Sequence, residues 1–197
     1  MPAEQLSKYR IILASRSPRR IQLLKDTGLD FSIEVRDYDE TYPRNLKGEE
    51  IALYLARHKA DSFRKEIREN EIVITADTIV WCNGEVLGKP DNEDDAKRMI
   101  RILAGNTHEV ITGVTLLTTR KEISFTDTTK VTFQEMTEEE INYYIDNFRP
   151  YDKAGAYGIQ EWIGITSCSS IEGSYFNVVG LPVHRVYKEL KALIKGT

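Results

Sequence analysis

The sequence predicts an α/β protein with a mixed, strongly twisted sheet flanked by helices. In the first half of the chain, apolar strand patterns alternate with amphipathic helix patterns, which is the order typical of α/β folds. Asn83-Gly84 between two strand patterns predicts a hairpin, so antiparallel strands should join the sheet. The length of 197 residues suits one large domain or two lobes that share a cleft, and we assign residues 1–197 to a single domain.

The first half of the chain should supply strands and helices in alternation. Ser17 followed by Pro18 is typical of a helix start, because the hydroxyl caps free N–H groups and proline needs no N–H partner in the first turn. The expected elements are strands at 11–15 and 31–35, a helix from Ser17-Pro18 that ends near Gly28, a polar loop at 36–47 and a helix at 49–68.

The second half should contribute longer strands and further helices. Thr137 with Glu140 three residues later forms a capping-box pattern, which predicts a helix start. Segments rich in β-branched residues predict long antiparallel strands. The expected elements are a strand at 72–81, a helix capped by Asp91 that stops near Gly105, strands at 108–119 and 123–135, a helix from Thr137 to Phe148, an irregular loop at 152–160, a strand at 162–169, a turn at Glu172-Gly173 and a helix from Gly180-Leu181-Pro182 to Ile194.

The composition argues against several classes of protein. A net charge of −4 is unfavourable for a general nucleic-acid or anionic-membrane surface. Cys82 and Cys168 lack CxxC spacing, which gives neither a disulfide framework nor a structural zinc site. The N-terminus has no apolar signal segment, and no apolar run reaches the roughly 18 residues that a membrane span requires. We therefore expect a cytoplasmic protein with no membrane or nucleic-acid partner.

Asp77 is the residue best placed for chemistry. It interrupts the apolar pattern of residues 72–81, and a lone carboxylate in such a strand is costly to bury without a partner. A metal ion, a lysine or a substrate proton could each be that partner, and Lys89 is the nearest cation along this stretch. A turn cap or a structural ion pair is the alternative role for Asp77.

The turn Ser15–Arg20, with the sequence SRSPRR, could bind an anion. Free N–H groups and the positive end of the helix dipole meet at a strand-to-helix junction. Arg19 and Arg20 would add bidentate donors for phosphate. A simple capped helix with solvated arginines is the alternative, because the turn is not a Walker A loop.

Asp39 and Glu40 join Asp77 as candidate metal ligands. Carboxylate oxygens are natural ligands of Mg²⁺, which keeps several waters and bridges to substrate phosphates. A solvated loop is the simpler explanation of Asp39 and Glu40 taken alone.

Three lysines are weaker candidates for ligand binding. Lys89 and Lys153 lie close to glycines in loops, where ligand contacts are common, whereas Lys59 lies on a predicted helix whose charged face should be solvated. Tyr157 and Gln160 in the glycine-rich loop could contact a base. The histidines show no metal-ligand spacing and are interpreted as structural or surface residues: His58, His108 and His184.

These stretches together carry a resemblance to a known family. They are LASRSPRR at 13–20, ADTIV at 76–80, GEVLGKP at 84–90, GNTHEVITGV at 105–114, DKAGAYGIQ at 152–160 and EGSYFNVVGLP at 172–182. In this order they resemble the signature blocks of Maf proteins, which are house-cleaning nucleoside triphosphate pyrophosphatases. The resemblance implies a mixed α/β fold related to that of inosine triphosphate pyrophosphatases, with two lobes and a central cleft. It also implies cleavage between the α- and β-phosphates that depends on Mg²⁺, with Mn²⁺ as the alternative ion, to give a nucleoside monophosphate and pyrophosphate.

The resemblance implies roles for individual residues. Asp77 matches the position assigned as proton acceptor, and Arg19, Thr78 and Gln160 match positions linked to substrate choice. Their identities are similar to those of the branch that acts on dTTP and UTP, not of the sister branch that acts on 7-methyl-GTP. The position of Asp39 is commonly glutamate, so this residue is one methylene shorter than usual. The polar lining of the family's pocket corresponds to Ser15, Arg20, Lys59, Lys89 and Lys153, and the metal ligands to Asp77, Asp39 and Glu40.

Other functions remain open at the level of the sequence. A nucleotide-binding regulator of septum formation would keep the arginines and lysines, but it would not need Asp77 and its acidic neighbours, so their joint presence favours an enzyme. A pyrophosphatase for CTP, modified pyrimidine nucleotides or other non-canonical nucleotides would share the chemistry and differ in the base pocket. A sequence-specific nucleic-acid binder fits the acidic balance least well. A homodimer is an expectation by family analogy only.

Overall fold

The structure is a computed structural model that describes residues 6–195, which pack as two compact units. The first unit contains the described residues up to Asp77, together with Thr112–Asp127 and the described residues from Gly180 onward. The second unit contains Thr78–Ile111 and Thr128–Val179. The assignment of residues 1–197 to one domain stays a prediction. The expectation of no signal segment concerns the N-terminus, where residues 1–5 lie outside the described part.

The strands of residues 6–195 form one seven-stranded sheet, which confirms the mixed α/β fold. They are β1 (Arg10–Leu13), β2 (Phe31–Ile33), β3 (Glu71–Cys82), β4 (Glu85–Leu87), β5 (Thr107–Leu117), β6 (Glu122–Phe133) and β7 (Cys168–Glu172). The order along the main path is β2-β1-β3-β5-β6-β7, and β4 pairs with β3 off this path. β1 runs parallel to β2 and β3, whereas β4 is antiparallel to β3 and β7 is antiparallel to β6.

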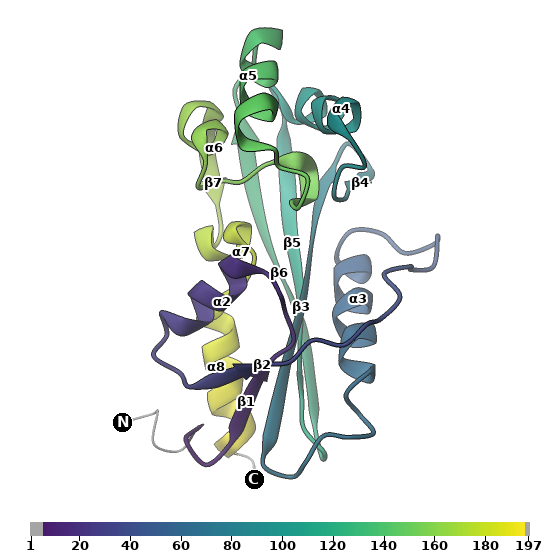
Figure 1. The fold of residues 1–197 in the computed structure, drawn as a ribbon, viewed down its shortest axis with the longest axis vertical. Coiled ribbons are helices and arrows are strands. Elements are labelled where there is room, and N and C mark those ends of the chain that lie inside the picture. Colours follow the sequence, from purple (N-terminus) through teal and green to yellow (C-terminus); the bar gives the residue numbers. More distant parts are fainter. Residues whose placement is uncertain (1–5, 196–197) are drawn as a thin grey trace. The chain divides into compact units, whose positions relative to one another are not determined.

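The helices of the first unit are α2 (Pro18–Lys25), α3 (Glu49–Asp61) and α8 (Val183–Lys195). Figure 1 shows α3 on one side of β1 and β3, with α2 and α8 on the other. The hydroxyl of Thr75 on β3 donates to the carbonyl of Ala56 on α3 at 2.7 Å. Gly113 of β5 makes room for α3, because a Cβ at that position would lie 2.1 Å from the carbonyl oxygen of Ala52. The small residues thus let α3 pack directly on the sheet.

The start of α2 agrees with the prediction. The hydroxyl of Ser17 accepts the N–H of Arg20 at 3.5 Å, and Pro18 lies in the first turn of the helix. Gly28 follows the helix with φ of 74°, a left-handed conformation that glycine adopts without strain. The turn between β1 and α2 is therefore fixed by a strand at one end and by a capped helix at the other.

The second unit confirms two further predictions. Its helical elements are α4 (Glu93–Leu103), α5 (Glu138–Phe148), α6 (Trp162–Ser167), α7 (Tyr175–Val179) and the 3₁₀ turn η1 (Ala154–Ala156). The capping box of α5 is present, because Thr137 and Glu140 each accept the backbone N–H of the other. The hairpin is present too, since Asn83 and Gly84 adopt φ of 51° and 85° between β3 and β4.

Some predicted boundaries are wrong. Asn92 caps α4 in place of Asp91, because the Asn92 side chain accepts the N–H of Asp95 at 2.9 Å. The helix predicted at 49–68 ends at Asp61. The short helix α7 has no counterpart in the sequence prediction.

The strand predicted at 162–169 is also wrong, since α6 covers most of this segment and β7 follows it. Gly164 lies so close to Ile159 that an added Cβ would be 1.9 Å from the Ile159 carbonyl oxygen. Trp162 packs edge-on to Tyr143 of α5, with ring centroids 5.0 Å apart. This packing overrides the β-branched composition of the segment.

Replacing Gly113 by Ala should destabilise the protein by about 2 kcal/mol or more, because the new methyl group would overlap the Ala52 carbonyl. Equilibrium unfolding in urea measures the effect. Gly88→Ala is the matched control, since a Cβ at Gly88 has no atom within 4 Å and should change the free energy of unfolding by less than about 0.5 kcal/mol. Equal unfolding midpoints for the two variants would contradict the close packing of α3 on β5.

Candidate active site

The predicted site residues divide between the two units. The first unit carries Ser15, Arg19, Arg20, Asp39, Glu40, Lys59 and Asp77, and the second carries Thr78, Lys89, Lys153 and Gln160.

Asp77 lies midway along β3, where its carboxylate meets a lysine. The Asp77 side chain is 20% exposed, and its Oδ1 lies 3.9 Å from Nζ of Lys59 on α3. Nζ of Lys59 also donates to the carbonyl of Ala76 at 3.3 Å, and the Lys59 side chain is 12% exposed. Asp77 therefore has the cationic partner that its position on a buried strand requires, and the expectation of a solvated Lys59 is wrong.

Arg20 of α2 approaches the same strand. Its guanidinium donates to the carbonyl of Ala76 at 2.9 Å and to the carbonyl of Gly180 at 2.8 Å. Burial lowers the pKa of the Arg20 guanidinium, and the negative charge of Asp77 opposes that shift. A helix with only solvated arginines is therefore wrong for Arg20, because its guanidinium bonds two backbone carbonyls.

Ser15 shapes the turn that presents these arginines. Its side chain is buried, and its hydroxyl accepts the N–H of Ser17 at 3.1 Å. The turn therefore has an internal hydrogen bond in addition to the cap of α2, and residues 15–20 carry two hydroxyl and three guanidinium groups on one short segment.

Tyr38 belongs to this group, although its only signal in the sequence is its place next to acidic residues. Nζ of Lys59 lies 4.6 Å from the centroid of the Tyr38 ring, a cation–π contact. The Tyr38 hydroxyl donates to Glu40 at 3.1 Å. Burial raises the pKa of Tyr38, and the charges of Asp77 and Glu40 raise it further, so the hydroxyl stays protonated. One tyrosine thus contacts both the lysine and the acidic loop.

Asp39 and Glu40 differ in what they bind. Both carboxylate oxygens of Asp39 accept from Thr41, one from the N–H at 2.9 Å and the other from the hydroxyl at 2.8 Å, and these bonds lower the pKa of Asp39. Glu40 instead accepts from Tyr38. Within residues 6–195, no three His, Cys, Asp or Glu side chains gather as a ready-made metal site. Mg²⁺ uses about one or two carboxylates when substrate phosphates complete its shell, and Asp77, Glu40 and Asp39 stay predicted ligands of such an ion.

In the second unit, the loop at 152–160 lies beside the loop that contains Lys89. The N–H of Gly155 donates to the carbonyl of Gly88 at 2.9 Å. Gly155 has φ of 68°, and a Cβ there would lie 2.9 Å from the side chain of Val80, so glycine is needed at this close approach. The contact brings the two segments with predicted lysines together.

The predicted residues of the second unit differ in exposure. The Lys153 side chain is 11% exposed, and its Nζ lies 2.7 Å from Asp152 and 3.1 Å from Glu161. The others are Thr78, which is half-buried on β3, and Lys89 and Gln160, which are exposed.

His108 and Tyr157 fasten the loop at 152–160 to the sheet. Nε2 of His108 lies 2.8 Å from the hydroxyl oxygen of Tyr157, and Phe133 packs edge-on to both rings. Both polar side chains are buried. The structural role expected of His108 is confirmed, and a base contact by Tyr157 is wrong, because this tyrosine anchors the loop from inside the unit.

The burial of His108 predicts a loss of stability in acid. Burial lowers the pKa of His108 from 6.5 to about 4. Between these two pH values the unfolded chain therefore binds a proton at this histidine, and the folded chain does not. The corresponding stability, about 3 kcal/mol, is present above pH 6.5 and is lost as the pH falls towards 4. Urea unfolding of the wild type and of His108→Gln at pH 7 and pH 4.5 should show a smaller loss in the variant. Equal losses would contradict the assignment of this pH dependence to His108.

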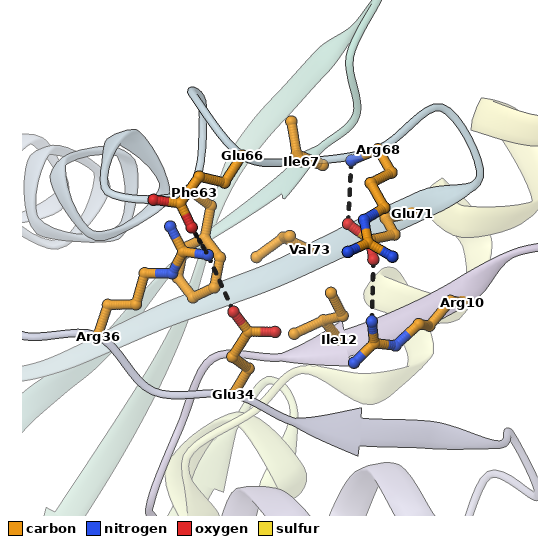
Figure 2. A pocket seen from close by; sticks show the side chains of 10 residues that line it. All are labelled: Arg10, Ile12, Glu34, Arg36, Phe63, Glu66, Ile67, Arg68, Glu71 and Val73. Atoms are coloured by element: carbon orange, nitrogen blue, oxygen red, sulfur yellow. Dashed lines mark hydrogen bonds and ion pairs between the residues drawn. The ribbon is translucent and has the colours of Figure 1, made fainter.

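A hollow of about 360 Å³ in the first unit contains none of the predicted residues. Three arginines and three glutamates line it. Figure 2 shows Arg10 paired with Glu71, at 3.0 Å, and Arg36 between Glu34 and Glu66, at 2.9 and 3.0 Å. The charges of this hollow balance one another, so it offers no net attraction for a phosphate chain and is not the candidate site.

Comparison with known proteins decides the family. The family model described as Maf-like protein matches residues 10–193. The chain belongs to the Maf family. Relatives named dTTP/UTP pyrophosphatase include one from Phocaeicola vulgatus, 55% identical over 96% of this chain and 99% of the relative, and one from Flavobacterium johnsoniae, 52% identical over 98% of this chain and 100% of the relative.

The fold of this Maf protein is also found in a more distant structure. The Ham1 protein of Staphylococcus aureus superposes with a TM-score of 0.53, over 95% of this chain and 98% of that chain, at 14% sequence identity. At that identity the similarity concerns the fold alone, and it agrees with the mixed α/β architecture that the Maf resemblance implies.

Proposed function

We propose that this protein is a nucleoside triphosphate pyrophosphatase that hydrolyses dTTP and UTP to the nucleoside monophosphate and pyrophosphate, and so removes these nucleotides from the pool. The observation that carries the proposal is the part-buried carboxylate of Asp77 beside the ammonium of Lys59. The Arg20 guanidinium lies close by, because it donates to the carbonyl of the adjacent Ala76. An acceptor for a water proton thus lies next to cations suited to phosphate oxygens. The names of the Maf relatives support the reaction and the substrates.

Charge stabilisation supplies most of the catalysis in this account. A triphosphate is strongly anionic, and negative charge moves to the leaving pyrophosphate as the anhydride bond breaks. Hydroxyl, guanidinium and ammonium donors fixed before the substrate arrives need little rearrangement during the reaction. The residues proposed for this role are Ser15, Arg19, Arg20, Lys59, Lys89 and Lys153.

Asp77 is the proposed proton acceptor. Water is the nucleophile, and Asp77 orients it and takes its proton as it attacks phosphorus. The ammonium of Lys59 lies 3.9 Å from the Asp77 carboxylate, where its positive charge attracts the carboxylate and faces the same space. Asp77 and Glu40 would hold Mg²⁺, or Mn²⁺, which would neutralise phosphate charge. Asp39 remains a predicted ligand whose oxygens are engaged by Thr41.

Recognition of the base is assigned mainly to uncharged polar residues rather than to the cations that bind phosphate. Thr78 and Gln160 offer a hydroxyl and an amide, which can hydrogen-bond the carbonyl and N–H groups of a pyrimidine. Arg19 is the third residue proposed for substrate choice. A pyrophosphatase for CTP or modified pyrimidine nucleotides would use the same groups, and a substrate panel that includes CTP compares CTP with dTTP and UTP.

Location and assembly belong to the same proposal. None of the helices in the described residues is long and apolar enough to cross a membrane. A cytoplasmic location, a homodimer and the absence of a nucleic-acid partner stay predictions from the sequence.

Asp77→Asn should lower kcat by about 100-fold or more, because the amide cannot take a proton from water. The variant should keep the fold and the unfolding temperature to within a few degrees. Asp61→Asn is the control, since Asp61 lies on α3 of the same unit and pairs only with Arg64 among the ion pairs seen there. A near-wild-type kcat for Asp77→Asn would show that Asp77 is not the proton acceptor.

The proposed function is tested by pyrophosphate release from dTTP, UTP, CTP, GTP, ITP and 7-methyl-GTP, with and without Mg²⁺. Turnover of dTTP and UTP that requires the ion supports both the reaction and the substrate assignment. Turnover confined to 7-methyl-GTP or ITP would keep the chemistry and contradict the roles of Thr78 and Gln160. Nucleotide binding with no turnover of any member would instead favour a regulator of septum formation.

A further inference from the structure

The hydroxyl of Tyr144 is a buried polar group with two partners. The Tyr144 side chain is fully buried in α5 of the second unit. Its hydroxyl donates a hydrogen bond to the Glu161 carboxylate and accepts the N–H of Gly158 at 3.0 Å. Burial raises the pKa of Tyr144, and its bond to Glu161 raises it further, so the proton stays on the hydroxyl. This arrangement fixes the direction of both bonds.

Glu161 links this tyrosine to a predicted substrate-binding residue. One carboxylate oxygen accepts from Tyr144, and the other lies 3.1 Å from Nζ of Lys153. Asp152 also pairs with Lys153, at 2.7 Å, but its side chain is 60% exposed whereas that of Glu161 is 24% exposed. Glu161 is therefore the better restrained of the two anions that hold the lysine.

The backbone around Gly158 is built to accommodate Glu161. A Cβ at Gly158 would lie 2.7 Å from Cδ of Glu161, so a larger residue there would push the carboxylate away from its position over the turn. The N–H of Glu161 donates to the carbonyl of Gly158 at 2.9 Å, and Gly158 in turn bonds Tyr144. This turn contains Gln160, which is predicted to contact the base, so the same contacts fix the backbone of that residue.

We propose that Glu161, held by Tyr144, is a positioning residue for Lys153, an inference that rests on the proposed function. A lysine side chain has many rotamers, and a substrate that must order it loses affinity. The Tyr144–Glu161 pair orders Lys153 before the nucleotide binds. Neither Glu161 nor Tyr144 contacts the reacting atoms in this account.

The direction of the change in KM distinguishes the positioning of Lys153 by Glu161 from a simple charge effect. Glu161→Gln removes a negative charge, and by Coulomb attraction alone this should strengthen the binding of an anionic triphosphate. Positioning predicts the reverse. We expect KM for dTTP to rise about fivefold or more with kcat changed less than about threefold, because the lost restraint acts on binding. Tyr144→Phe keeps every charge and should raise KM in the same direction by a smaller factor.

A double-mutant cycle tests whether Glu161 acts through Lys153. The variants are Glu161→Gln, Lys153→Met and the double variant, with thermal unfolding of each to confirm the fold. Glu138→Gln is the control, because Glu138 lies on the surface of α5 and pairs with Arg101. In the Lys153→Met background, Glu161→Gln should change KM by less than about twofold.

Three results would overturn the inference: an unchanged or lower KM for Glu161→Gln, the same increase in KM with and without Lys153, or wild-type kinetics for Lys153→Met. Tyr144→Phe keeps the test decisive if Glu161→Gln does not fold. Failure of the proposed function looks different, because the wild-type enzyme would then turn over no nucleotide, and the inference would fall with it.

Discussion

A carboxylate midway along a buried strand is the constraint on which the first unit depends. The cations that interact with Asp77 come from helices on the strand's two sides. Lys59 arrives on α3, which lies close to the sheet because Gly113 has no side chain and Thr75 bonds the helix backbone. Arg20 arrives on α2, whose start is fixed by the cap at Ser17. The packing of α2 and α3 therefore determines where the positive charges of the site lie.

Local signals explain why much of the fold was predictable from the sequence. The capping box at Thr137 and Glu140 and the hairpin at Asn83-Gly84 each involve residues within a few positions of one another, so the sequence contains the whole interaction. The helix α6 was not predictable in this way. Its β-branched residues favour a strand, and the contacts that make it a helix involve Tyr143, which precedes Trp162 by a whole loop.

The same distinction between local signals and contacts of distant residues applies to the site. Asp77 was identifiable because a charge inside an apolar run is visible in the sequence, whereas the burial of Lys59 depends on which face α3 turns to the sheet. In the sequence Asp39 differs from Glu40 by its shorter side chain, and the structure adds different partners, Thr41 for Asp39 and Tyr38 for Glu40. The hydrogen bond between Tyr144 and Glu161 joins residues 17 positions apart, so no local sequence pattern predicts it. Comparison with relatives supplies the family and supports the substrates, which no single side chain could establish.

The central claim is that Asp77 and its neighbouring cations direct water to the bond between the α- and β-phosphates. Phosphorus NMR of dTTP during turnover by the wild-type protein tests this most directly, because it identifies the bond that breaks. The account predicts that dTMP and pyrophosphate appear together in equal amounts from the first measurable turnover, and that neither appears with Asp77→Asn over the same period. Accumulation of dTDP with orthophosphate would place the cleavage at the terminal phosphate and would contradict the account.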